Sequence, residues 1–344
     1  MNSTFVKVRA RERRFDLCGI ARADRHPKLA KLQAWIASGF AGDMRYLSDS
    51  LDERMDPERV LPTVRSVISL AVCYNTSQPY STADAVRGRA AISRYAWGEN
   101  YHDVLRGRLR RLVQDLATEA GSGFEAFSCV DDGPVQERVF AEQAGLGWIG
   151  KNTCLINPEV GSWIFLAEIL TNAELDPDAA IPDHCGTCTR CLDACPTSAI
   201  VEPYAVDATK CVSYLTIEAR GALDDVSGAA ITQQVYGCDI CQDVCPWNQR
   251  AHTSQDQAWQ PRDGLAFPLL IDLCRMSDDE WRARLKDSAM RRAGLRRLRR
   301  SLAYAAVHQK PLDGGAAIQA LSEHPSAADP LVAAVLNGDR FPHP

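Results

Sequence analysis

The sequence lacks the long apolar run that a membrane span requires. No stretch approaches the roughly 20 apolar residues that cross a bilayer, and Lys7 interrupts the N-terminus before an apolar signal segment forms. Arg13-Arg14-Phe15 resembles a twin-arginine export signal, but the segment that follows is too short and too soon charged to serve as its apolar region. We therefore expect a soluble, cytoplasmic protein without a membrane partner.

The sequence also lacks an excess of charge of one sign. The formal net charge is only −5 for 344 residues. A protein that binds nucleic acid through its overall charge would carry a strongly basic field, so any such partner must bind a local basic patch. The length allows two or three domains, which excludes a small module held together only by disulfides.

Cysteine, in contrast, is abundant: the chain has 13. A reducing cytosol argues against disulfides. The first group has the spacing of a bacterial ferredoxin run, in which three thiolates bind one [4Fe-4S] cluster and the fourth binds a second cluster: Cys185, Cys188, Cys191 and Cys195, followed by Pro196. The remaining ligands are supplied by Cys211 and by a second group, Cys238, Cys241 and Cys245, followed by Pro246.

This spacing predicts two [4Fe-4S] clusters with one exchanged ligand each. We assign Cys185, Cys188, Cys191 and Cys245 to one cluster. The other takes Cys195, Cys211, Cys238 and Cys241. Zinc sites commonly use paired Cys-x2-Cys knuckles, whereas here three cysteines at successive x2 spacings are followed by x3-Cys-Pro, which disfavours zinc. Five further cysteines stand in apolar surroundings and are expected to be core residues: Cys18, Cys73, Cys129, Cys154 and Cys274.

The order of apolar segments predicts an α+β protein of several domains. Short apolar runs at 17–21, 67–74 and 124–130 are typical of buried strands, and 103–120 has helical spacing. Further predictions are a β-hairpin from 154–156 and 163–170, a helical insertion at 212–236, and a capping box formed by Ser277 and Glu280. The expected domains are 1–175 (α/β), 176–255 (ferredoxin-like) and 256–344 (helical).

Two motifs in the first domain suggest ligand contacts. The segment 145–150 matches a dinucleotide fingerprint, but a helix precedes it and a strand follows, the reverse of that motif's setting. We interpret it as a glycine-rich turn that lets backbone approach a ligand, with Lys151 nearby. Asp131 and Asp132 follow the third strand, where one aspartate could cap the next helix and the other could face a ligand.

A cluster of basic side chains marks the last domain. It comprises Arg291, Arg292, Arg296, Arg297, Arg299 and Arg300. Arg292, Arg296, Arg299 and Arg300 follow helical spacing and would share one face. Such a face is often merely solvated, but arginine forks also suit phosphate oxygens.

These motifs together resemble the epoxyqueuosine reductase family, over nearly the whole chain. Beside the cysteines, the resemblance rests on 130–138, 147–152 and 237–248, and on 54–62, 94–98, 101–102 and 214–218. It implies an oxidoreductase that reduces epoxyqueuosine to queuosine at the wobble position of tRNA, the last step of queuosine biosynthesis. It further implies cobalamin bound base-off, which suits a chain without an Asp-x-His-x-x-Gly motif, and a flavodoxin- or ferredoxin-type electron donor.

The resemblance also implies roles for single residues. Asp131 matches the family's proton donor, and Asp132 stands where the family usually has threonine. Cofactor contacts are expected from Arg54, Arg94, Asp131, Lys151 and Asn152, with Ser213 and Asp239 close to a cluster. The C-terminal helices would form a HEAT-like unit that binds tRNA through Arg220 and the arginine cluster, and the family suggests a monomer.

Two other interpretations stay open at this point. A corrinoid reductive dehalogenase also pairs cobalamin with two clusters, but it would need an export signal and no arginine cluster. A ferredoxin-like electron carrier without catalytic activity would need the cysteines alone, and a large domain ahead of them would lack a purpose.

Overall fold

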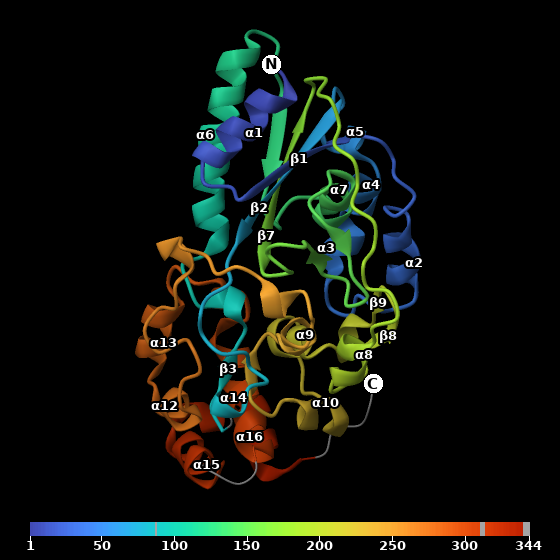
Figure 1. Cartoon of the computed structure of the whole chain (residues 1–344). Coiled ribbons are helices and arrows are strands. Elements are labelled where there is room, and N and C mark those ends of the chain that lie inside the picture. Colours follow the sequence, from blue (N-terminus) through green and yellow to red (C-terminus); the bar gives the residue numbers. More distant parts are fainter. Residues whose placement is uncertain (87, 310–313, 340–344) are drawn as a thin grey trace.

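The computed structural model describes residues 1–86, 88–309 and 314–339. Figure 1 shows a sheet with flanking helices at one end, the cysteine-rich segment beside its lower edge, and a group of helices at the other end. In the described ranges, no helix combines the length and apolarity that a membrane span needs.

The sheet has four strands in the order β1-β2-β7-β4. They are β1 Leu17–Arg22, β2 Ser66–Cys73, β7 Ile164–Thr171 and β4 Ala126–Cys129. The three predicted strands are confirmed. All three pairings are antiparallel, so this domain has an antiparallel sheet rather than the parallel sheet of a doubly wound α/β domain.

Alternation along the central strand β2 separates two packing layers. Ile68, Leu70 and Val72 face the core shared with the long helix α6, Tyr101–Ala120, which confirms the helix expected at 103–120. Val67 and Ala71 point the other way. They pack in the core that includes α7, Glu137–Gln143. Helix α1, Ser3–Glu12, lies beside α6 (Figure 1), and four short helices follow β1: α2 Lys31–Ala37, α3 Arg45–Asp49, α4 Leu51–Met55 and α5 Pro57–Val60.

The predicted hairpin is wrong in its pairing. β6, Leu155–Ile156, pairs with β5, Trp148–Ile149, while β7 joins the central sheet. The glycine-rich turn serves this small hairpin: a Cβ at Gly147 would lie 2.2 Å from the Ile156 carbonyl oxygen. The close approach is therefore to the chain itself, which corrects the expectation that these glycines admit a ligand.

The cysteine-rich segment contains short elements that are tied to the first domain. It comprises α8 Arg190–Ala194, β8 Ile200–Glu202, β9 Ala205–Val206, α9 Val212–Ile217, α10 Asp225–Ala230, β10 Gln234–Tyr236 and α11 Ile240–Asp243. The insertion predicted as helical thus ends in a strand. That strand, β10, pairs in parallel with β3, Ala91–Ile92.

The C-terminal region is helical, as predicted. Its helices are α12 Leu270–Arg275, α13 Asp278–Leu285, α14 Gly294–His308, α15 Gly314–Glu323 and α16 Pro330–Asn337. The capping box of Ser277 and Glu280 is confirmed. One hydrophobic core runs from Val6 in α1 to Val335 in α16, so the regions pack together. The three domain boundaries stay a prediction.

Candidate active site and cluster ligands

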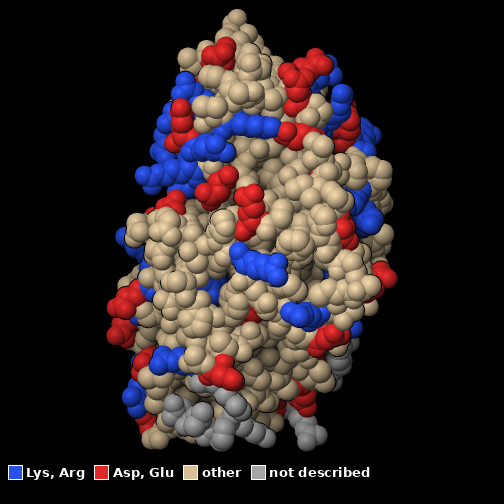
Figure 2. Space-filling view, viewed as in Figure 1, with Lys and Arg blue, Asp and Glu red and all other residues tan. Residues whose placement is uncertain are grey.

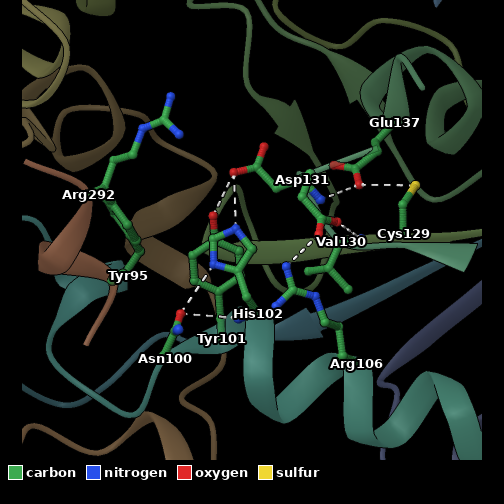
Figure 3. A network of polar contacts seen from close by, with 12 residues as sticks. Tyr95, Asn100, Tyr101, His102, Arg106, Cys129, Val130, Asp131, Glu137 and Arg292 are labelled. Atoms are coloured by element: carbon green, nitrogen blue, oxygen red, sulfur yellow. Dashed lines mark hydrogen bonds and ion pairs between the residues drawn. The ribbon is translucent and has the colours of Figure 1, made fainter. Parts of the chain in front are cut away.

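Asp131 lies on the loop that leaves β4 and has a left-handed backbone conformation, φ 60°. The hydroxyl of Tyr101 donates a hydrogen bond of 2.6 Å to its Oδ2. His102 Nε2 lies 3.8 Å from the same oxygen. Figure 3 shows both rings, from the first turn of α6, directed at the carboxylate. The side chain of Asp131 is 64% exposed, so it is open to a ligand.

The Asp131 loop is anchored by its neighbours. The backbone N–H of Asp131 donates to Glu137 Oε1 at 2.6 Å. Asp132 accepts from the backbone N–H of Val130 at 3.0 Å and pairs with Arg106. Neither aspartate caps the following helix, because α7 begins after Gln136 and has no side-chain cap. The cap expected from the paired aspartates is therefore wrong: Asp132 closes the loop on itself instead.

The charges around Asp131 favour particular protonation states. Burial, and then the charge of Asp131, raises the pKa of Glu137 well above its ordinary value. Burial also lowers the pKa of His102. His102 Nδ1 lies 3.1 Å from the side-chain oxygen of Asn100. That oxygen can only accept, so Nδ1 carries the proton in neutral His102 and its Nε2 lone pair faces Asp131. The carboxylate thus stands between one proton donor and one proton acceptor.

Sequence reasoning assigned no role to Tyr101, His102, Arg106 or Glu137. Tyr101 and Asp131 are 30 positions apart, and no local spacing connects them. Glu137 lies in the same sequence motif as Asp131, the segment 130–138, so the resemblance already placed it near Asp131. The fold brings these residues together by placing the start of α6 beside the end of β4.

The predicted cofactor contacts are not all available. The Arg94 guanidinium is buried and donates to Thr76, Gln78 and Pro79, with its Cζ 4.7 Å from the Trp97 ring centroid. Its side chain is committed inside the protein, which corrects the expectation of a ligand contact.

Two other predicted contacts point toward the cysteine-rich segment. Lys151 donates to the carbonyl oxygens of Gly186 and Cys188 at 2.6 and 3.0 Å. Asn152 is buried, and its side-chain nitrogen lies 3.4 Å from the Cys241 carbonyl oxygen. Arg54 is part-buried and donates to Ser50.

The eight predicted ligand cysteines are free thiols and fall into two neighbourhoods. Burial, and then the charges of Cys245 and Cys185, raises the pKa of Cys191 to about 11. Burial, and then charges that include those of Cys211 and Cys195, raises the pKa of Cys238 well above its ordinary value. These neighbours are the ones that the predicted ligand exchange requires.

Backbone groups contact several of the predicted cluster ligands. In the part of the chain that the structure describes, no three His, Cys, Asp or Glu side chains lie together as a site for one metal ion. The backbone N–H of Ala199 donates to Cys195 Sγ at 3.3 Å. Burial raises the pKa of Cys211, and hydrogen bonds from the backbone N–H groups of Ser213 and Tyr214 offset part of this rise. Asp239 is buried and accepts from the Arg94 backbone N–H at 2.7 Å.

The predicted arginine face is divided by the fold. Arg291 and Arg292 belong to a 3-10 turn, and α14 starts only at Gly294. Arg299 and Arg300 are 2% and 0% exposed and donate to backbone carbonyl oxygens, so they cannot contact RNA, which corrects that prediction. The sequence pattern of the helix did not predict this burial, because the carbonyl oxygens that accept from Arg299 and Arg300 belong to distant segments of the chain.

The other predicted tRNA contacts stay at the surface. Arg220, Arg291, Arg292 and Arg296 are exposed and Arg297 is half-buried. On the face shown in Figure 2, basic and acidic side chains are mixed over most of the surface, and the densest basic group lies over α1 and α6.

Comparison with known proteins gives the family. Residues 54–132 match the family model described as "Epoxyqueuosine reductase QueG, DUF1730", and residues 184–248 match the "4Fe-4S double cluster binding domain". A relative from Gloeobacter violaceus, an epoxyqueuosine reductase, is 46% identical over 308 residues, 86% of this chain and 94% of its own. The chain belongs to the epoxyqueuosine reductase family. It is therefore an oxidoreductase by family.

Two solved members of the family align over 97% of this chain and 88% of their own. One, an epoxyqueuosine reductase with an epoxyqueuosine-modified tRNA-Tyr stem loop, is 31% identical with a TM-score of 0.85. The other, from Bacillus subtilis, has its catalytic aspartate loop swung out of the active site and is 30% identical with a TM-score of 0.84. These relatives do not favour the dehalogenase or the electron-carrier interpretation.

Proposed function

We propose that this chain reduces epoxyqueuosine to queuosine at the wobble position of tRNA. The observation that carries the proposal is the Asp131 site: an exposed carboxylate held by Tyr101 and Glu137, in the segment that matches the family, beside a segment with eight free cysteines. An enzyme that acts on tRNA works where tRNA is, so we place it in the cytoplasm.

The donor set suits two [4Fe-4S] clusters. One would be held by Cys185, Cys188, Cys191 and Cys245. The other would be held by Cys195, Cys211, Cys238 and Cys241. The neighbours that shift the pKa values of Cys191 and Cys238 support this division. Lys151 supports the first ligand loop through Gly186 and Cys188.

We propose cobalamin, bound base-off, between this segment and the Asp131 loop. Arg54 and Asn152 are the candidates to hold it, since the side chains of Arg94 and Lys151 donate to the protein itself. Ser213 and Asp239 would lie close to a cluster. Fit is supported by the exposed carboxylate of Asp131 on one side and the cysteine-rich segment, which Asn152 reaches, on the other. When bound, cobalamin would supply the two electrons that open the epoxide.

The chain's own residues would manage the protons. Reduction of the epoxide to the alkene consumes two electrons and two protons and releases the oxygen as water. Asp131, protonated at Oδ1 while Oδ2 accepts from Tyr101, would give a proton to the departing oxygen. Tyr101 orients this carboxyl group, and His102 Nε2, 3.8 Å from it, would exchange protons with it through one bridging water. Because Asp131 is exposed, the bound substrate and cofactor would have to supply the desolvation that keeps a carboxylic acid neutral.

Exposed arginines would contact tRNA. Arg220, Arg291, Arg292, Arg296 and Arg297 remain candidates on the helical C-terminal region, which we propose to be HEAT-like. The remaining proposals are a flavodoxin- or ferredoxin-type electron donor and a monomeric state.

Nucleoside analysis of tRNA tests the proposed function. A strain that lacks the gene should accumulate epoxyqueuosine, and a plasmid copy should restore queuosine. A copy with Asp131→Asn should leave the epoxide in place. Unchanged queuosine in the deletion strain, with no epoxide and no second gene of the family in the genome, would reject the proposal.

A further inference from the structure

Near the Asp131 site, the guanidinium of Arg292 lies over the exposed aromatic ring of Tyr46. Tyr46 in α3 is 43% exposed. Arg292 places its Cζ 5.2 Å from the centre of this ring. Two hydrogen bonds, 2.9 and 3.2 Å long, join the Arg292 guanidinium to the carboxylate of Glu218. The stack therefore combines the N-terminal domain, the cysteine-rich segment and the C-terminal region.

The chain segment before Tyr46 is held in place. The backbone N–H of Asp43 donates to the Tyr214 hydroxyl at 2.8 Å, and Asp43 Oδ2 accepts from the backbone N–H of Arg220 at 3.1 Å. Gly42 allows this approach, because a Cβ there would lie 2.3 Å from the same hydroxyl. Tyr46 thus follows an anchored turn, so its ring is held in position before any ligand binds.

The stack lies close to the reacting carboxylate. Burial and the charges of Glu218, Arg292 and Asp131 act together on the pKa of Tyr46, which is raised. Figure 3 shows Arg292 beside the Asp131 loop, on the side of Asp131 away from Arg106. A ligand whose reacting group reached Asp131 would bring its neighbouring groups to this stack.

The chemistry of the stack suits a nucleobase. Proteins that read single-stranded RNA stack unpaired bases on aromatic rings or on arginine planes. A wobble nucleotide that reaches an enzyme site must leave the stack of its loop, which exposes the faces of the adjacent bases. As a tie between regions the stack would be weak, since an exposed cation–π contact contributes only about 0.5–1 kcal/mol.

We propose that Tyr46 and Arg292 form a stacking platform for the base next to the wobble nucleotide in the anticodon loop. This inference rests on the proposed function and extends it by naming a second RNA subsite. The base stacks on the exposed ring of Tyr46, and Glu218 fixes the position of the Arg292 guanidinium through two hydrogen bonds.

Binding of an anticodon stem loop that carries epoxyqueuosine tests the platform. The variants are Tyr46→Ala and the conservative Tyr46→Phe, at one salt concentration, with loops that are intact or abasic at either nucleotide beside the wobble position. Tyr46→Ala should weaken binding of the intact loop by about 5- to 150-fold, the usual effect of losing one stacked base. Tyr46→Phe should retain the affinity. One of the two abasic loops should bind wild type and Tyr46→Ala equally.

Three results would overturn the platform. Tyr46→Ala could bind the intact loop as wild type does, or it could lose the same factor with both abasic loops. It could also lose cobalamin affinity in titrations without RNA, which would place the ring against the cofactor. Conversion of the epoxide by wild type in the same preparations separates these results from failure of the proposed function, and iron content and melting temperature check that each variant folds.

Discussion

Arg300 offers a direct test of how the C-terminal arginines divide between structure and RNA binding. Its side chain is fully buried in α14 and donates to the carbonyl oxygens of Leu215, Ala219 and Gly221. Burial lowers its pKa to about 10. The change Arg300→Met keeps much of the volume but removes every donor. The carbonyl oxygens of the buried residues Leu215 and Ala219 would then lose this donor, whereas Gly221 is exposed to water.

The magnitude follows from these contacts. Leaving the buried carbonyl oxygens of Leu215 and Ala219 without a donor costs about 1–3 kcal/mol each, about 2–6 kcal/mol together. With an unfolding entropy of about 2.1 cal/mol/K per residue over 344 residues, the melting temperature should fall by about 3–8 °C, as measured by differential scanning calorimetry.

Arg296→Met is the matched control. Arg296 lies one turn earlier in α14, its side chain is 59% exposed, and it pairs only at the surface with Asp329. It should change stability by less than about 0.5 kcal/mol but should reduce the salt dependence of stem-loop binding. An Arg300→Met protein that melts like wild type and binds RNA less tightly would refute the structural role.

Three further predictions concern the site and the cofactors. Glu168 is fully buried, burial raises its pKa well above 4.5, and Ser69 donates to it. The protonated form is therefore favoured in the fold, and its stabilisation is complete below the unfolded pKa and lost as pH rises through the folded pKa. Glu168→Gln should thus gain melting temperature relative to wild type between pH 6 and pH 9, and a constant difference would contradict this. Cys211→Ala and Cys245→Ala should each lower the iron content from about eight to about four per chain, whereas Cys274→Ala should keep about eight; full iron in either ligand variant would reject the assignment. Glu137→Ala should reduce kcat by roughly 2- to 10-fold with a smaller change in KM, because the hydrogen bond that Glu137 accepts from the Asp131 backbone N–H is lost, while Glu137→Gln keeps an acceptor and most of the activity; equal rates for the two variants would argue against this positioning role.

Local patterns were predictable from the sequence. The ligand run that starts at Cys185 depends on spacings of a few residues, and the apolar repeat of α6 and the capping box at Ser277 are equally local. The family resemblance rested on motifs of the same kind.

Features that depend on distant partners were not predictable. The periodicity of α14 placed Arg299 and Arg300 opposite the leucines. Arg300 is nevertheless buried, because it donates hydrogen bonds to carbonyl oxygens as far as 85 positions away. Strand β7 reads as the second arm of a hairpin, yet β2 offers it a partner along its whole length. Likewise, no spacing connects Tyr101 with Asp131, because their contact is made only when α6 and β4 pack.

Turnover by the purified protein tests the central claim most directly. Protein loaded with iron, sulfide and cobalamin, supplied with a chemical reductant, should convert epoxyqueuosine in an anticodon stem loop to queuosine, as measured by mass spectrometry of the nucleosides. Asp131→Asn, with the same iron and cobalamin content, should leave the epoxide. The account would be contradicted if fully loaded wild type formed no queuosine, or if Asp131→Asn formed it at the same rate.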